Sequence, residues 1–143
     1  MTPQYLFAYG TLLSGALEPE VDVVLRRHCR LGPAATVAGY LLDLGEYPGA
    51  LPARTPGQRV RGHLLELLAP ARCLPLFDQY EGFDPAAPSA SLYLRERVSA
   101  TLDEDRERVD CWIYWLRRKP RAARIIPGGD WMAYVESRRR GGR

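Results

Sequence analysis

Short apolar runs, separated by glycines and prolines, form the pattern along this chain of 143 residues. The first run is apolar and aromatic on both faces and ends at Gly10, as expected of a short buried strand. In two later runs, on either side of the charged turn 103–107, apolar and polar residues alternate, which predicts an antiparallel hairpin. The proline-containing stretch after residue 44 predicts a loop. The segments that read as strands are 5–9, 36–44, 59–67, 92–102 and 108–116.

Helical spacing appears between and after these strands. Residues 18–29 and 71–82 each place apolar side chains on one stripe, and Asp130 is a suitable N-cap for a closing helix. Short strands with helices inserted between them favour an α+β fold, in which a mixed, curved β-sheet forms a small barrel with short flanking helices. We expect one domain over residues 1–137, followed by a basic flexible tail, 138–143.

Composition narrows the classes of function. Apolar residues make up 46% of the chain and charged residues 26%, as in a soluble globular protein. No apolar run is long enough to span a bilayer and no basic leader opens the chain, so we expect no membrane contact. The basic segment 116–124 lacks the interleaved aromatic residues of a single-strand binder, which argues against a nucleic-acid partner. Three widely spaced cysteines favour the reducing cytoplasm.

The turn that follows the first strand is the first candidate for chemistry. A strand that stops at Gly10 and turns toward a helix leaves backbone N–H groups pointing outward, and such groups hold carboxylates or developing oxyanions. The N–H groups of Thr11 and Leu12 are the candidate donors. The alternative interpretation is that Gly10 only permits a turn.

Glu81 is the candidate for proton transfer. Leu74, Phe77 and Glu81 share one face of the predicted helix, so the Glu81 carboxylate is expected to face inward, where burial raises the pKa of a carboxyl group. The alternative is a solvated glutamate at a helix end. Pro75 lies inside the same segment and removes a backbone donor, so the helix is expected to start later or to kink there.

Five short motifs span nearly the whole chain: "YGTL" at Tyr9–Leu12, "YPG" at Tyr47–Gly49, "FDQYEG" at Phe77–Gly82, "YLRERV" at Tyr93–Val98 and "GGDW" at Gly128–Trp131. In their order and spacing they resemble the gamma-glutamylcyclotransferase-like family. Within that family, "YGTL" is more similar to the gamma-glutamylamine and bacterial branches.

This resemblance implies an enzyme that binds a gamma-glutamyl amine or peptide and releases 5-oxoproline and a free amine. It assigns substrate binding to Tyr9, Gly10, Thr11 and Leu12, and general acid/base catalysis to Glu81. The reaction needs neither a metal nor an organic cofactor, in line with a sequence that has two histidines and no ligand cluster. The leaving amine and the oligomeric state stay open.

Tyr93 and Arg95 complete the set of candidate binding residues. They lie two positions apart on a predicted strand and therefore share a face, which offers a hydroxyl and a guanidinium to the same space. Arg95 is expected to pair with a substrate carboxylate or with Glu81. The alternative is an arginine on a solvated strand face. Tyr114 and Trp112, on the partner strand, are expected to form core or cavity wall.

Two other classes of function compete with this one. A non-catalytic module could keep the same pocket and bind a gamma-glutamyl metabolite without turning it over. A cysteine hydrolase would use Cys29 or Cys111 with His28 or His63, but adjacent His28 and Cys29 diverge on a helix and no glycine-framed turn surrounds Cys111. The presence of Glu81 favours the cyclotransferase.

Overall fold

The computed structural model describes residues 2–10, 12 and 18–141; Thr11, a predicted binding residue, lies outside these ranges. The strands are β1 (Tyr5–Ala8), β2 (Cys29–Asp43), β3 (Pro48–Pro52), β4 (Arg59–Leu67), β5 (Tyr93–Leu102), β6 (Arg108–Leu116) and β7 (Arg124–Ile125). The α-helices are α2 (Pro19–His28), α3 (Pro70–Glu81) and α4 (Trp131–Gly141). Two 3₁₀ turns lie at Pro88–Ala90 and Pro127–Gly129.

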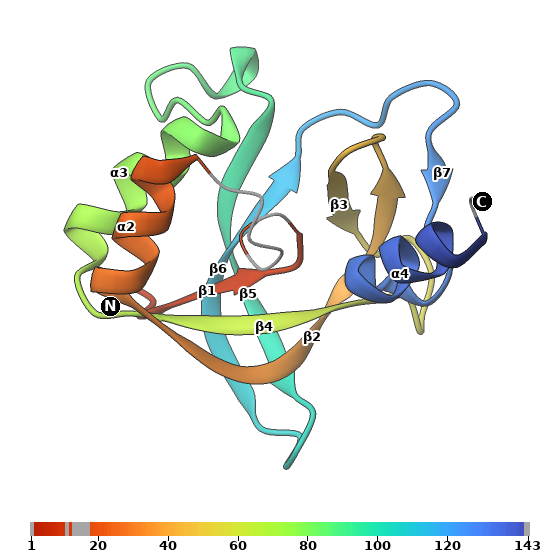
Figure 1. Cartoon of the computed structure of the whole chain (residues 1–143), viewed down its shortest axis with the longest axis horizontal. Coiled ribbons are helices and arrows are strands. Elements are labelled where there is room, and N and C mark those ends of the chain that lie inside the picture. Colours follow the sequence, from red (N-terminus) through yellow and green to blue (C-terminus); the bar gives the residue numbers. More distant parts are fainter. Residues whose placement is uncertain (1, 11, 13–17, 142–143) are drawn as a thin grey trace.

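The sheet closes on itself, as Figure 1 shows, and this closure confirms the α+β barrel predicted from the sequence. Its order is β1-β4-β2-β3-β6-β5, and a further pairing of β1 with β6 completes the barrel. β1 and β3 run parallel to β6, whereas the other pairings are antiparallel, so the sheet is mixed. The predicted hairpin is present, with Tyr93 opposite Leu116 and Thr101 opposite Arg108.

The first strand is apolar on both faces because it lies between two cores. Phe7 and Tyr9 belong to the cluster that includes Trp131 of α4, whereas Leu6 and Ala8 belong to the cluster that includes Phe77 of α3. α2 and α3 lie together on one side of the barrel and α4 on the other (Figure 1). Burial of both faces makes β1 a fixed support for the turn that follows it.

The predicted loop after residue 44 contains a strand that the sequence pattern did not indicate. β3 begins and ends with proline, at Pro48 and Pro52, and pairs with β2 from Asp43↔Pro48 to Gly39↔Pro52. Proline lacks an N–H, so it is tolerated at strand ends, where a ladder hydrogen bond can be missing. The cluster of prolines therefore marked the ends of a strand as well as a turn.

Helix α3 runs from Pro70 through Pro75 to Glu81, so the expected late start was wrong. Pro75 is exposed and removes one intrahelical bond on the solvent side. The expected tail from residue 138 was also wrong in its boundary, because α4 continues to Gly141. Asp130 caps this helix, as predicted, and accepts a hydrogen bond from Ala133 N at 3.1 Å. Within the described ranges, no helix combines the length and apolar character that crossing a bilayer requires.

Candidate active site

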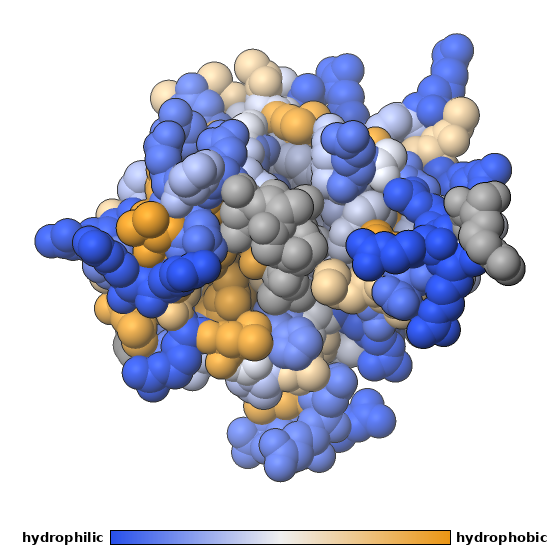
Figure 2. Space-filling view, in the orientation of Figure 1, coloured by the Kyte–Doolittle hydropathy of each residue, from blue (hydrophilic) through white to orange (hydrophobic). Residues whose placement is uncertain are grey.

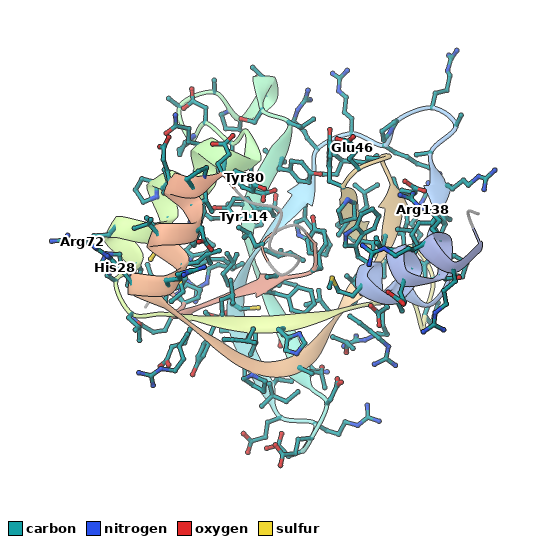
Figure 3. All side chains as sticks on the ribbon, viewed as in Figure 1. His28, Glu46, Arg72, Tyr80, Tyr114 and Arg138 are labelled. Atoms are coloured by element: carbon teal, nitrogen blue, oxygen red, sulfur yellow. The ribbon has the colours of Figure 1, made fainter. Side chains whose placement is uncertain are left out.

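A cavity of about 360 Å³ lies where β1 ends, beside the start of β3, the end of α3 and the start of β5. It is lined largely by aromatic side chains, with Glu81 as its acidic residue. Figure 3 shows Tyr80 of α3 and Tyr114 of β6 close together in this region. The lining residues are Phe7, Ala8, Tyr9, Gly10, Leu12, Tyr47, Pro48, Gln79, Tyr80, Glu81, Gly82, Leu92, Tyr93 and Tyr114.

Glu81 is the last residue of α3, and the way this helix ends fixes its position. Gly82 adopts a left-handed conformation with φ of 74°. Its N–H bonds to Gln79 O at 3.2 Å, and the N–H of Phe83 bonds to Asp78 O at 2.8 Å, which together form a Schellman motif. Leu92 N then donates to Gly82 O at 2.9 Å and ties this helix end to β5. The glycine directly after the glutamate thus holds the carboxyl group at the cavity.

Burial raises the pKa of the Glu81 carboxyl group to about 7. Among the described residues, none donates a hydrogen bond to this carboxylate, and no lysine or arginine lines the cavity. The negative end of the helix dipole at the C-terminus of α3 also disfavours the charged form. A carboxyl group with a pKa near neutrality can both accept and donate a proton, which is what a general acid/base requires.

Three tyrosines around Glu81 are oriented by the hydroxyl hydrogen bonds that they donate, namely Tyr9, Tyr93 and Tyr114. Tyr9 donates to Tyr114 O and accepts from Ala50 N at 3.3 Å. Tyr93 donates to Pro48 O at 2.8 Å. Burial raises the pKa of each of these tyrosines, as does the nearby Glu81 charge, so they stay protonated. These three hydroxyl groups therefore face Glu81 as neutral groups held by hydrogen bonds.

Gly10 is required by a close contact with Pro48. A Cβ atom at Gly10 would lie 2.7 Å from Pro48 Cγ, whereas its φ is outside the left-handed region. Because glycine has only backbone atoms, its contribution to the cavity is peptide backbone. The glycine thus allows two neighbouring segments of the cavity wall to approach each other.

Arg95 is not among the residues that line the cavity, so the structure does not bring it together with the other predicted binding residues. Its Nε and Nη2 donate to the two carboxylate oxygens of Asp78 at 2.7 and 3.2 Å, and Asp78 also accepts from Tyr114 OH at 2.7 Å. The guanidinium lies over the Trp112 ring, 4.4 Å from its centroid. The pair is largely buried, with 16% of the Arg95 side chain and 8% of the Asp78 side chain exposed. Arg95 therefore anchors α3 to the hairpin one turn before Glu81.

The structure brings Tyr9, Gly10, Leu12 and Tyr93 to the same cavity as Glu81. Sequence reasoning assigned no role there to Pro48 or Gln79 and overlooked Asp78 behind the wall. The "YPG" and "FDQYEG" motifs contain all three of these residues, so the motifs were the available signal.

The thiols do not form a hydrolase site. Cys111 is fully buried, and its Sγ donates to Val98 O at 3.5 Å. Burial raises the pKa of Cys29 and of Cys111 to about 12, so both thiols are protonated near neutral pH. Cys29 and His63 border one cavity, but no hydrogen bond joins them within the part of the chain that the structure describes. The same part contains no group of His, Cys, Asp and Glu residues suited to a metal ion.

Solved structures share this fold. An AIG2-like protein from Mus musculus is 20% identical over 84% of this chain and 81% of its own, with a TM-score of 0.62. An uncharacterised protein from Pyrococcus horikoshii is 15% identical over 97% of this chain and 98% of its own, with a TM-score of 0.63. A protein specific to uropathogenic Escherichia coli is 17% identical over 95% and 98% of the two chains, with a TM-score of 0.63. No curated protein matches the chain.

The sequence profile described as "Gamma-glutamyl cyclotransferase, AIG2-like" matches residues 6–133. This match begins in β1 and ends inside α4, so it contains the barrel, the cavity and Glu81. It confirms the resemblance drawn from the motifs of the sequence. The chain belongs to the gamma-glutamyl cyclotransferase, AIG2-like family.

Proposed function

We propose that this protein is a gamma-glutamyl cyclotransferase that releases 5-oxoproline and an amine, with Glu81 as the general acid/base. The observation that carries the proposal is the Glu81 carboxyl group at a cavity wall formed by the end of β1, with its pKa raised to about 7 by burial. Membership of the gamma-glutamyl cyclotransferase, AIG2-like family supports the reaction class.

The cavity suits a small substrate with an apolar stem and few polar groups. Its aromatic wall would pack against the methylene groups of the glutamyl moiety, as most small-molecule sites do. Because no cation of the described residues lines it, the substrate carboxylate would be held by backbone N–H groups at the turn after β1. Gly10 and Leu12 border the cavity, and the predicted role of Thr11 at the same turn belongs to this proposal.

The reaction needs proton transfer rather than an external nucleophile. The Glu81 carboxylate takes a proton from the substrate α-ammonium, and the freed amine attacks the γ-carbonyl carbon to form a five-membered ring. The C–N bond of the amide then breaks as protonated Glu81 returns its proton to the departing nitrogen. The ring nitrogen keeps one of the three ammonium protons, so two protons pass to the leaving amine, and Glu81 can relay both. Glu81 ends the cycle as a carboxylate.

The test is 5-oxoproline release from a panel of gamma-glutamyl amides by wild-type protein and by Glu81→Gln. The amide side chain is nearly isosteric but cannot carry the proton, so kcat should fall by roughly 10²–10⁴-fold with the fold intact. Glu96→Gln is the matched control, because Glu96 is exposed on β5 and should leave kcat unchanged.

The panel also separates this reaction from simple ligand binding. A non-catalytic module would bind one of the amides and release no 5-oxoproline, in the wild type as in Glu81→Gln. Wild-type turnover that persists in Glu81→Gln would instead remove Glu81 from the reaction. Thiol alkylation should leave turnover unchanged, because the cysteine thiols are not part of the cavity wall.

A further inference from the structure

A second cavity, of about 530 Å³, adjoins the first. Tyr47 and Leu92 line both cavities, and their side chains are 40% and 52% exposed. Leu92 also joins the two walls through its backbone. Its N–H donates to Gly82 O at 2.9 Å, and its carbonyl accepts from Arg117 N at 3.1 Å. Leu92 is thus hydrogen-bonded both to Gly82, directly after Glu81, and to Arg117 in the wall of the second cavity.

The second cavity is positively charged. Arg117, Arg118 and Arg121 line it, all from the segment between β6 and β7. Among the described residues, none forms an ion pair with these three arginines. Arg117 is fixed by a bond from its Nε to Ser91 O at 2.6 Å. Hydrophilic side chains project from the edge where Figure 1 shows this connection (Figure 2).

The acidic residue that lines this cavity, Asp43, already has an ion-pair partner and hydrogen-bond donors. Asp43 accepts hydrogen bonds from Tyr134 OH at 2.6 Å, from Gly45 N at 2.7 Å and from Arg138 at 3.1 Å. The Asp43 carboxylate is therefore bonded to groups other than the three arginines that line the cavity. Glu46, in the next turn, is exposed and is not part of the lining. The field inside the second cavity is consequently that of the guanidinium groups.

We propose that the second cavity receives the leaving amine of the substrate and selects amines that bear an anionic group, a carboxylate or a phosphate. The inference rests on the proposed function, which sets the scissile amide beside Glu81. From there the substituent on the amide nitrogen would cross the apolar edge formed by Tyr47 and Leu92 and reach the arginines. Guanidinium groups bind carboxylate and phosphate oxygens in a bidentate geometry, and they repel cationic polyamines and aminoglycosides.

The test compares gamma-glutamylglutamate, gamma-glutamyl-O-phosphoethanolamine, gamma-glutamylethylamine and gamma-glutamylputrescine as substrates. The wild type should prefer the anionic amides over the ethylamine compound by about tenfold in kcat/KM and accept the cationic compound least. Substituting both Arg118→Gln and Arg121→Gln should lower kcat/KM about threefold for each lost guanidinium, for the anionic amides only. Whichever anionic amide is the better substrate identifies carboxylate or phosphate as the group recognised.

The control protein carries Arg27→Gln and Arg72→Gln, which remove the same charge from exposed positions on α2 and α3; Figure 3 shows Arg72 on the far side of the molecule from Arg138. Its preference among the amides should equal that of the wild type. High salt should reduce the wild-type preference, because exposed charges are screened. Equal losses for charged and neutral amides, or no loss, in the Arg118/Arg121 variant would overturn the proposed subsite.

Binding of the same amides to Glu81→Gln, measured by calorimetry, separates this proposal from the proposed function. If anionic amides bind preferentially but the wild type releases no 5-oxoproline, the subsite stands and the cyclotransferase reaction fails. If the wild type turns over all amides but binding shows no anionic preference, the reaction stands and the subsite fails. If no amide binds or reacts, both fail.

Discussion

Glu81 is the residue at which protonation and activity are expected to coincide. Because burial raises the pKa of its carboxyl group to about 7, the carboxylate needed as a base forms only as the pH passes through that value. We predict that kcat/KM for 5-oxoproline release rises with pH, with a midpoint of about 7. A rate profile from pH 5 to 9 measures this, and a midpoint near the ordinary glutamate pKa of about 4.3 would contradict it.

The same carboxyl group should destabilise the fold when it ionises. Its pKa is higher in the folded than in the unfolded chain, so the folded state binds the proton more tightly and stability falls as the pH rises from about 4.5 to about 7. Glu81→Gln lacks this penalty and should be more stable than the wild type by about 1–2 kcal/mol above pH 7, after a discount for solvent in the cavity. Thermal unfolding at pH 5 and pH 8 measures it; an advantage that is larger at pH 5 would refute the assignment.

Gly10 and Pro48 should show strong coupling as a residue pair. A methyl group at Gly10 would lie 2.7 Å from Pro48 Cγ, so Gly10→Ala should lower stability by about 1–3 kcal/mol. Pro48→Ala removes the opposing ring atoms, and in that background the same substitution should cost clearly less. Denaturant unfolding of the four proteins gives the coupling free energy. Additive effects of the two substitutions would mean that Gly10 is not required by its close contact with Pro48.

At the scale of elements, the Asp78–Arg95 pair joins α3 to the β5–β6 hairpin. Breaking a buried ion pair leaves an uncompensated charge, so Arg95→Met should lower stability by about 3 kcal/mol. It should also lower kcat, because Glu81 lies one turn beyond Asp78. The matched control is Arg97→Met on the same strand, whose pair with Asp110 is about half exposed and should contribute less than about 1 kcal/mol. Equal effects of the two substitutions would show that the anchoring is unimportant.

At the scale of the whole molecule, the end of α4 is bound to the barrel. Arg138 donates to Asp43 at 3.1 Å and to Gly45 O at 3.3 Å, and it lies over the rings of Trp131 and Tyr134. Although burial by itself would raise the pKa of Asp43, the bonds from Tyr134 and Gly45 and the Arg138 charge lower it.

Removing residues 138–143 should therefore lower stability by about 1 kcal/mol, whereas removing 141–143 should change little. A depressed folded-state pKa means that the Asp43 contribution is present above the unfolded pKa and is lost as the pH falls through the folded one. The difference between the two truncations should accordingly be largest above about pH 4 and shrink in acid. Thermal unfolding across pH measures it. A free tail would give identical curves for both truncations.

Three features that depend on residues close together in the sequence were predicted correctly, whereas the contact of Arg95 with a distant residue was not. Asp130 as a helix cap, the hairpin around 103–107 and the helix that ends after Glu81 depend on neighbours in the sequence, and all three are present. Arg95 was assigned from alternation on its strand, but alternation gives only a face and not a partner. Its partner, Asp78, lies on another element, 17 positions away along the chain.

The amino-acid sequence alone identifies the family, through the profile match over residues 6–133, and it predicts the local geometry that ends α3 at a glycine directly after Glu81. The pairing of β1 with both β4 and β6 appears only in the folded molecule, where it closes the barrel and brings residue 10 against Pro48 and beside residue 81. Burial of Glu81, and with it the raised pKa, exists only after that closure. The physical reason is that desolvation and ion pairing depend on atoms far apart in the chain, whereas caps and turns depend on adjacent backbone groups.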